Sequence, residues 1–338
     1  MTILTKLWVT SAAVAQGTTG ARNATADRST GKCPSGAVRA AGHNDGFGAQ
    51  FLAMFSVFVY ARQRGKTFCT SRWHRLDFNQ DAKAVWDWFG GDAYGPNYDG
   101  TSAIETIASA AKIINWADSA PERSFAHAAY AERIAIRRPV NELFANDTGR
   151  LTIAMHIRAG SDMVTPDGER KKNIFVRRWS LWEHRVACLD YLAANVTGDR
   201  PYALHVFTDG KYIDFSPLAR FHPRLHIDYD LISSLDHMIA ADILVIAKSS
   251  FSESAAILRN DADHTYFPFT ADHAELSFLR MDRTLGKTCV PHLCHGMAAE
   301  ECILPARYHE CLKATSRITS RLPLKSRLGN WCKKRLRA

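Results

Sequence analysis

The sequence predicts an α/β protein with two Rossmann-like domains, whose parallel sheets face a central crevice, and a cysteine-rich C-terminal extension. Three short apolar runs in the second half support this prediction, and each run ends in polar residues: 151–155, 203–207 and 242–247. Such runs are typical of buried parallel strands, and ligands of open parallel sheets bind beyond the carboxyl ends of the strands. A chain of 338 residues is long enough for two such domains.

The first half begins with a strand, a glycine-rich turn and a helix. Residues 37–41 predict a short strand, residues 51–64 a helix with apolar side chains at nearly every position, and residues 66–70 the next strand. Between the first strand and the helix lie Gly46 and Gly48, which allow backbone amides to approach a ligand at the helix N-terminus. A tight turn without a ligand explains the same glycines.

Aromatic residues are frequent between residues 71 and 118, and a helix is predicted from 121 to 138. Aromatic rings in a loop-rich stretch either line a sugar-binding groove or anchor the loops to a core. The usual burial of aromatic side chains favours the core. Residues 141–149 are expected to connect the two domains.

The second half alternates strands with helices, which predicts a mostly parallel sheet covered on both faces. The expected strands are 151–157, 202–208, 224–227, 242–247 and 264–267, and the expected helices are 179–194, 213–221, 231–240 and one that starts at 252.

The net charge of +9 is located in a C-terminal tail. Residues 312–338 contain nine basic and no acidic residues, so the rest of the chain is close to neutral. Binding of nucleic acid by the whole protein is therefore not expected. We expect the tail to be a surface segment that contacts an acidic membrane face or an acidic partner.

Eight cysteines, five of them in the last 50 residues, allow either disulfide bonds or a zinc site. The zinc candidates are Cys289, Cys294, Cys302, His292, His295 and His309. The absence of a Cys-x-x-Cys pair favours disulfides.

Three N-glycosylation sequons begin at Asn23, Asn146 and Asn195, and with the cysteines they predict a protein of the secretory pathway lumen (ER or Golgi) or a secreted one. Residues 7–15 resemble a short signal peptide, with a disordered leader or a truncated gene as the alternative. We expect no membrane span, because no segment reaches the roughly 18 apolar residues that a span needs.

Polar side chains at the strand ends predict an anion site. Arg158 follows the strand at 151–157, and its planar guanidinium suits a phosphate bidentately. Ser249, Ser250 and Ser252 lie where a strand turns into a helix, and hydroxyls and open amides there also bind anions. Helix capping is the alternative role of these serines.

Three further polar residues are predicted near the same crevice. Asp209, at another strand end, can accept hydrogen bonds from the N1–H and N2–H of guanine or from ribose hydroxyls. Asp236 is expected on a helix that borders the crevice, and either aspartate can instead be a solvated cap. His156 either contacts the ligand or is a structural histidine of the crevice wall.

These residues resemble, in order and spacing, the three motifs of GDP-fucose-dependent fucosyltransferases, the superfamily of the α1,2-, α1,6- and protein O-fucosyltransferases. The stretches that carry the resemblance are His156-x-Arg158-x-Gly160-Ser161-Asp162, then Phe207-Thr208-Asp209, then Ala241-Asp242 with Ser249-Ser250-Phe251-Ser252. Gly46-Phe47-Gly48-Ala49-Gln50 is similar to the Gly-x-Gly-Asn-Gln loop of the same enzymes.

The resemblance implies a GT-B glycosyltransferase that transfers fucose from GDP-fucose to a glycan or protein hydroxyl with inversion, without a metal or another cofactor. It implies that Arg158 is catalytic, because it would bind the donor phosphates and stabilise the departing GDP. The implied donor-binding residues are His156, Asp209, Asp236, Ser249, Ser250, Phe251, Ser252, Gly46, Phe47 and Gly48. The sequence departs from the family at Ala49, where Asn is frequent, which leaves the acceptor and the catalytic base unassigned.

With the resemblance, the chain divides into four parts. Residues 1–32 are a leader or signal-like segment, 33–148 an acceptor-side Rossmann-like domain, 149–275 a nucleotide-sugar domain, and 276–338 the cysteine-rich basic extension.

Three alternatives stay open. A metal-dependent GT-A glycosyltransferase would use Asp228-Tyr229-Asp230, which has the spelling of an Asp-x-Asp motif. A non-catalytic binder of nucleotide or glycan would keep the crevice, and Ala49 favours it. A secreted structural protein would leave the polar residues at the strand ends unexplained.

Overall fold

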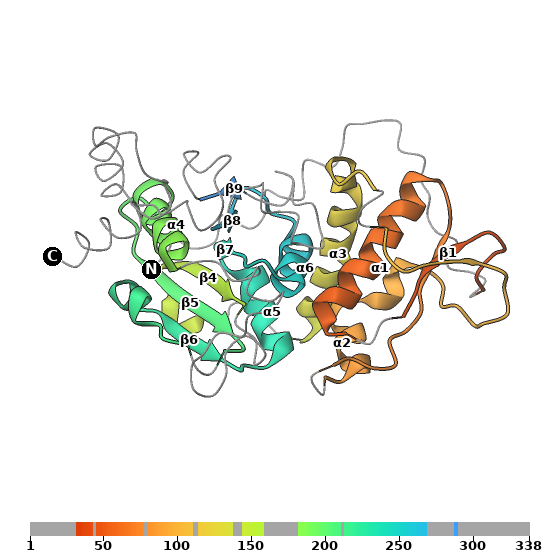
Figure 1. Ribbon diagram of the computed structural model, residues 1–338, viewed down its shortest axis with the longest axis horizontal. Coiled ribbons are helices and arrows are strands. Elements are labelled where there is room, and N and C mark those ends of the chain that lie inside the picture. Colours follow the sequence, from red (N-terminus) through yellow and green to blue (C-terminus); the bar gives the residue numbers. More distant parts are fainter. Residues whose placement is uncertain are drawn as a thin grey trace, which may run out of the picture.

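The computed structural model confirms an α/β architecture with two parallel sheets. It describes residues 32–42, 45–77, 80–110, 114–137, 144–158, 182–210, 213–268 and 287–289. In Figure 1 the N-terminal elements (orange and yellow) lie on the right, the larger sheet on the left, and helices α5 and α6 between them. The predicted leader, the basic tail and most of the cysteine-rich extension lie outside the described residues.

The first sheet has three parallel strands in the order β2-β1-β3. They are β1 (Val38–Ala40), β2 (Phe68–Cys69) and β3 (Glu105–Ile107). Helix α1 (Phe47–Gln63) follows β1 and begins four residues before the predicted start at 51. Glycine has a low helix propensity, so the sequence predicts a loop, whereas tertiary contacts hold Gly48 inside the first helical turn.

Helix α1 is the centre of the N-terminal half, since 13 of its residues are buried. Around it pack α2 (Ala82–Phe89), α3 (Ala120–Arg137) and the 3₁₀ helices Gly91–Tyr94 and Ala117–Ser119. Most of the aromatic residues between 71 and 118 belong to this core. The buried ones are Trp86, Trp88, Phe89, Tyr94 and Trp116. The expectation that these rings pack in a core is confirmed, but Trp86, Trp88 and Phe89 lie on helix α2 and not on loops.

The second sheet has six parallel strands in the order β6-β5-β4-β7-β8-β9. Its elements along the chain are β4 (Leu151–Ile157), α4 (Trp182–Asn195), β5 (Tyr202–Thr208), the 3₁₀ helix Ser216–Phe221, β6 (Arg224–Ile227), α5 (Leu231–Ala240), β7 (Ile243–Val245), α6 (Ser250–Arg259), β8 (Thr265–Phe267) and β9 (Lys287–Thr288). All five predicted strands are present, and β9 is an additional edge strand. Helix α6 begins two residues before the predicted position 252.

One hydrophobic cluster includes residues of both halves, from Val38 to Phe267. Helix α6 packs against α1 and α3, so the two halves meet over buried helices. A polar contact fixes the same region, because the indole N–H of Trp88 and the hydroxyl of Tyr130 both donate to Asp236 Oδ1 at 2.8 Å. The division into separate domains at residues 148 and 149 stays a prediction.

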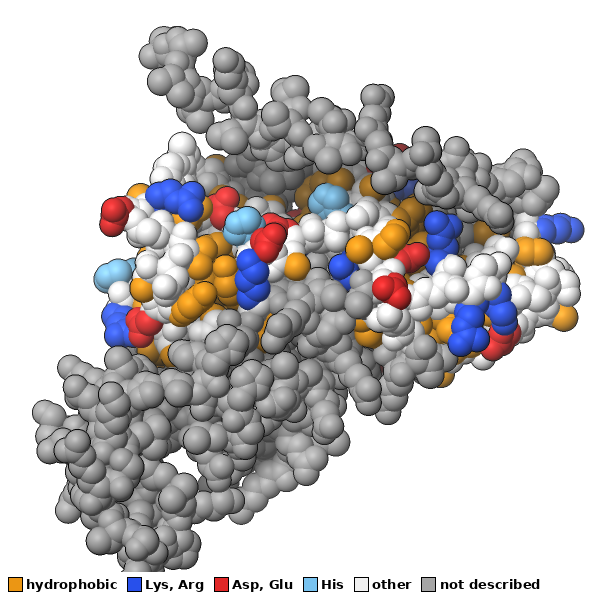
Figure 2. Space-filling view, turned by 90° about the horizontal axis from the view of Figure 1, so that it is seen from above, with side chains coloured by type: hydrophobic (Ala, Val, Ile, Leu, Met, Phe, Trp, Pro, Cys, Tyr) orange, Lys and Arg blue, Asp and Glu red, His pale blue; other side chains and the backbone are white. Residues whose placement is uncertain are grey.

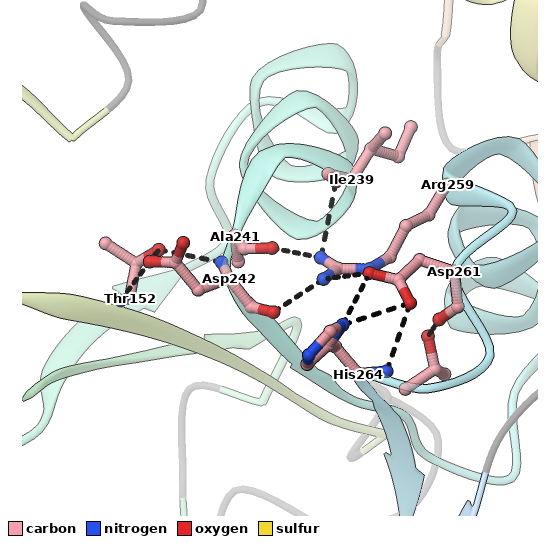
Figure 3. A network of polar contacts seen from close by, with 8 residues as sticks. Thr152, Ile239, Ala241, Asp242, Arg259, Asp261 and His264 are labelled. Atoms are coloured by element: carbon pink, nitrogen blue, oxygen red, sulfur yellow. Dashed lines mark hydrogen bonds and ion pairs between the residues drawn. The ribbon is translucent and has the colours of Figure 1, made fainter. Parts of the chain in front are cut away.

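A polar network ties the amino ends of the central strands to two helices (Figure 3). Asp242 Oδ2 accepts the backbone N–H and the hydroxyl of Thr152 at 2.7 and 2.8 Å, which links β7 to β4. The buried guanidinium of Arg259, at the end of α6, donates to the carbonyls of Ala241 and Asp242 beyond the end of α5. The network therefore fixes α5 and α6 relative to the sheet on which they pack.

Two disulfides are present in the described part of the chain, Cys33–Cys69 and Cys188–Cys289. The first disulfide connects the segment that precedes β1 with strand β2. The second connects helix α4 with the residue that follows β9. The preference for disulfides is supported for these four cysteines. Cys289 is accordingly not a zinc ligand, and the other five zinc candidates lie outside the described residues.

The structure also describes two of the predicted glycosylation sites and the distribution of charge on the surface. Asn146 and Asn195 are exposed, as glycosylation requires, and Asn23 lies outside the described residues. On the face shown in Figure 2, acidic and basic side chains of the described residues are interspersed. Each helix within the described ranges is too short or too polar to cross a bilayer.

Reduction of the disulfides is expected to lower the melting temperature by roughly 5 °C or more. The two bonds close loops with sequence separations of 36 and 101 residues, and restricting the unfolded chain in this way stabilises a fold by about 3–5 kcal/mol per bond. Circular dichroism melts with and without a phosphine reductant measure the shift. A variant with Cys33, Cys69, Cys188 and Cys289 all replaced by Ala should show a smaller shift on reduction than the wild type, because any remaining shift must come from the other four cysteines. An unchanged melt of the wild type on reduction would contradict the prediction.

Candidate functional site

A cavity of about 760 Å³ lies between the two halves of the protein. Its walls come from the start of α1, from α2, from the carboxyl ends of β4 and β5, and from the starts of α5 and α6. Nine of the residues predicted from the sequence line it together: Gly46, Phe47, Gly48, His156, Arg158, Asp209, Ser249, Ser250 and Phe251. Residues that lie up to about 200 positions apart in the chain are thus brought to one cavity.

The N-termini of α1 and α6 meet at this cavity. Gly48, in the first turn of α1, lies so close to α6 that a Cβ atom there would overlap the backbone of Ser250 and Phe251. The residues before the two helices, Gly46 and Ser249, make no side-chain capping hydrogen bond. The first-turn amides of both helices therefore present their positive ends to the same space, an arrangement that favours an anion.

Arg158 and Asp209 are neighbours because β4 and β5 are in register. Ile157 pairs with Thr208 at the ends of the two strands, and the next residue on each strand is Arg158 and Asp209. Arg158 Nη1 donates to Asp209 Oδ2 at 3.2 Å, with 24% and 39% of the two side chains exposed. Arg158 Nε is buried and has no hydrogen-bond partner among the described residues. The exposed quarter of the side chain, and not the buried Nε, is the part that a ligand in the cavity can reach.

His156 is a buried residue of the cavity lining, and its imidazole is uncharged. Only 6% of the residue is exposed, and its ring packs edge-on against Phe251 with centroids 5.3 Å apart. Burial lowers the pKa of His156 to about 3, because desolvation and the nearby Arg158 outweigh the opposing effect of Asp209. Nδ1 has no hydrogen-bond partner within the described ranges. At neutral pH the imidazole therefore does not carry charge.

Two of the predicted donor-binding residues lie elsewhere. Asp236 is 4% exposed and accepts hydrogen bonds from Trp88 and Tyr130, so its carboxylate faces the core between the halves and does not line the cavity. Ser252 is fully buried, and its Oγ accepts the N–H of Ala247 at 3.1 Å. Ser252 thus connects the start of α6 to the end of the preceding strand region, whereas the alternative role of side-chain capping is not seen at Ser249.

The cavity also contains residues that the sequence did not assign to the donor site. Asp228, Tyr229 and Asp230 form the loop between β6 and α5, and Asp230 Oδ2 caps α5 by accepting the Ser233 N–H at 2.9 Å. Tyr229 is 47% exposed. The position of this loop directly after a predicted strand was the signal that could have placed it at the same edge as Arg158 and Asp209.

The described lining carries more acidic than basic charge. It includes five aspartates (Asp45, Asp81, Asp209, Asp228 and Asp230) and one arginine, Arg158. Asp81 and Asp230 cap helices α2 and α5, and Asp209 pairs with Arg158. Across the described residues, no three His, Cys, Asp or Glu side chains converge in a geometry that could hold a metal ion.

Comparisons with known proteins give structural but not sequence relatives. No family model and no curated protein matches the sequence. Among solved structures, the chain is similar to the fucosyltransferase NodZ from Bradyrhizobium, with 12% identity and a TM-score of 0.38 over 67% of this chain and 94% of that one. It is also similar to POFUT1 in complex with GDP-fucose, with 12% identity and a TM-score of 0.39 over 70% of this chain and 98% of that one. The wall teichoic acid polymerase TagF aligns with 11% identity and a TM-score of 0.29 over 86% and 85% of the two chains.

Gly48→Ala is expected to destabilise the protein by about 1–3 kcal/mol, because the added methyl group must displace the backbone of α6. Urea denaturation followed by tryptophan fluorescence measures the change. The matched control is Gly42→Ala, where a Cβ atom meets nothing within 4 Å. Equal midpoints for the two variants would show that α1 and α6 are not in this close contact.

Proposed function

We propose that the protein is a glycosyltransferase that transfers fucose from GDP-fucose to a hydroxyl group of a glycan or protein, with inversion and without a metal or another cofactor. The observation that carries the proposal is the meeting of two helix N-termini beside Arg158 in one cavity between two parallel sheets. A diphosphate is the part of the donor that this arrangement suits, since it needs several N–H donors and a fixed positive charge.

The diphosphate would lie in the cavity, beside the adjoining starts of α1 and α6. Each helix N-terminus carries roughly half a positive charge, and Arg158 supplies a full one. The ion pair with Asp209 restrains the Arg158 side chain before the donor arrives. As the guanidinium turns to the phosphates, Asp209 becomes available to the N1–H and N2–H of guanine or to the ribose hydroxyls.

The same groups favour departure of the nucleotide. In the transfer, the bond between the anomeric carbon of fucose and the phosphate oxygen breaks, and negative charge grows on that oxygen. Arg158 and the helix amides stabilise this charge more than they stabilise the ground state, which is the requirement for catalysis. The acceptor hydroxyl attacks the opposite face of the sugar, which gives inversion. Its proton passes to a base that the proposal leaves unassigned.

A nucleotide-binding protein without turnover is the second candidate, and Ala49 favours it. Ala49 lines the cavity in the position where the fucosyltransferase loop often has Asn, and its methyl group cannot hydrogen-bond an acceptor. The metal-dependent alternative is less well supported. Asp228 and Asp230 do line the cavity, but the carboxylate of Asp230 already caps α5.

The proposed place of action is the lumen of the secretory pathway or the extracellular space. Two disulfides persist in such oxidising compartments, and the exposed sequons at Asn146 and Asn195 suit a glycoprotein.

GDP is expected to stabilise the protein, and Arg158→Ala is expected to remove most of this effect. A ligand that binds only the folded state adds about 2.7 kcal/mol at 100 times its dissociation constant. A thermal-shift titration measures the response. The matched control is Arg64→Ala, which removes an exposed arginine at the far end of α1. A GDP response that survives in Arg158→Ala would contradict the assigned role, and the lack of any response in the wild type would contradict the nucleotide site.

Release of fucose from GDP-fucose is expected to proceed at the same rate in the presence and absence of EDTA. Chromatography of released GDP and free fucose, with water or added glycans as acceptors, measures this rate. Loss of activity in EDTA that Mn²⁺ or Mg²⁺ restores would favour the metal-dependent alternative. Binding of GDP-fucose by the wild type without any release, with water or the added glycans, would favour the non-catalytic candidate.

A further inference from the structure

A second cavity, of about 380 Å³, lies at the opposite edge of the six-stranded sheet. It is formed at the amino ends of β4 and β5, by Arg150, by the turn 197–201 before β5, and by the chain around 220–224 before β6. A strand of seven residues, such as β5, separates it by about 20 Å from the edge at which Arg158 and Asp209 lie. It is therefore not part of the proposed donor site.

Four arginines line this cavity: Arg150, Arg200, Arg220 and Arg224. The described lining residues include no aspartate or glutamate, in contrast to the donor cavity. With the nine basic residues of the tail set aside, the chain is close to neutral, so the cluster does not follow from its average composition.

Two of the arginines form ion pairs with carboxylates outside the cavity lining, one buried (Asp147) and one exposed (Asp190). Arg224 Nη1 donates to the buried Asp147 at 2.6 Å, and Asp147 in turn lies 3.0 Å from His205 Nε2. Arg220 donates to Asp190 of α4 at 2.6 Å and stacks on Phe221. Neither carboxylate lines the cavity.

The other two arginines have no acidic partner among the described residues. Arg150 and Arg200 are exposed, and within the described part of the chain their guanidinium groups make no ion pair or hydrogen bond to another residue. The cavity thus combines two arginines in ion pairs, Arg220 and Arg224, with two that are not. Such a cluster suits an oxyanion, because each planar guanidinium can donate two parallel hydrogen bonds to it.

We propose that this arginine-lined cavity binds a tetrahedral oxyanion, a phosphate or sulfate group, that is carried by a saccharide or is free in solution. The cavity is larger than the anion itself, and Tyr202, Ala203 and Leu204 give it an apolar side. A phosphorylated or sulfated sugar would place its charged group on Arg150 and Arg200 and its ring against this side. The proposal does not depend on the identity of the donor substrate.

Isothermal titration of the full-length protein tests the site. The probes are N-acetylglucosamine 6-sulfate, glucose 6-phosphate, inorganic phosphate and neutral glucose. The anionic probes are expected to bind with dissociation constants of about 1 mM or tighter, and glucose is expected not to bind. The double variant Arg150→Ala/Arg200→Ala is expected to lose affinity by about tenfold or more, since a charged hydrogen bond contributes about that factor.

The matched control is Arg62→Ala/Arg64→Ala, which removes the same charge from exposed positions at the end of α1 and leaves the basic tail in place. Circular dichroism confirms that each variant is folded. Sugar esters that bind more tightly than inorganic phosphate would identify a saccharide ligand, and equal affinities would identify the oxyanion alone; both results support the site. The proposal is overturned if no anionic probe binds the wild type, or if the control variant loses as much affinity as the Arg150/Arg200 variant.

Discussion

The close backbone contact between α1 and α6 is the constraint on which the rest of the structure depends. With no side chain at Gly48, the first turn of α1 can lie directly against Ser250 and Phe251, and the hydroxyl of Ser254 reaches the Gly48 carbonyl at 3.5 Å. The two helices follow strands of different sheets, and this contact brings the positive ends of both helix dipoles to one place. The rest of α1 is mostly buried and forms the centre of the N-terminal core. Aromatic side chains of α2 pack on it, as Trp88 does on Phe47 and Phe89 on Phe51.

Asp236 fixes the same arrangement from the other side of the donor cavity. Burial of a carboxylate costs several kcal/mol unless hydrogen bonds compensate for the lost water. Trp88 of α2 and Tyr130 of α3 provide two such bonds, and both donate to the same oxygen. Helices α2 and α5, which form facing walls of the cavity, are therefore connected through a contact that lies behind it. The cavity is shaped before a ligand arrives, which reduces the entropy lost on binding.

Residues at strand ends could be predicted from the sequence, and residues whose role depends on a partner far along the chain could not. Arg158, Asp209 and Ser249 lie within three residues of the ends of the apolar runs, and parallel strands bring such positions to one edge. Asp236 was placed on the correct helix, but its partners lie 148 and 106 positions away, and nothing in the local pattern indicates them. The helical start of α1 at Phe47 was missed for the same reason, since the contact with α6 outweighs the low helix propensity of glycine.

The charge of the donor cavity suggests how the proposed donor would be recognised. In the donor cavity the described lining has five aspartates and one arginine, so long-range attraction does not draw a dianion in. Recognition must come from short-range donors, namely the amides of two helices and the exposed part of the Arg158 side chain. A ligand that offers a diphosphate to these groups and N–H donors to Asp209 satisfies both members of the ion pair at once. A diphosphate without the base would bring negative charge next to Asp209 without the N–H donors that compensate for it, so the proposed arrangement favours the complete nucleotide.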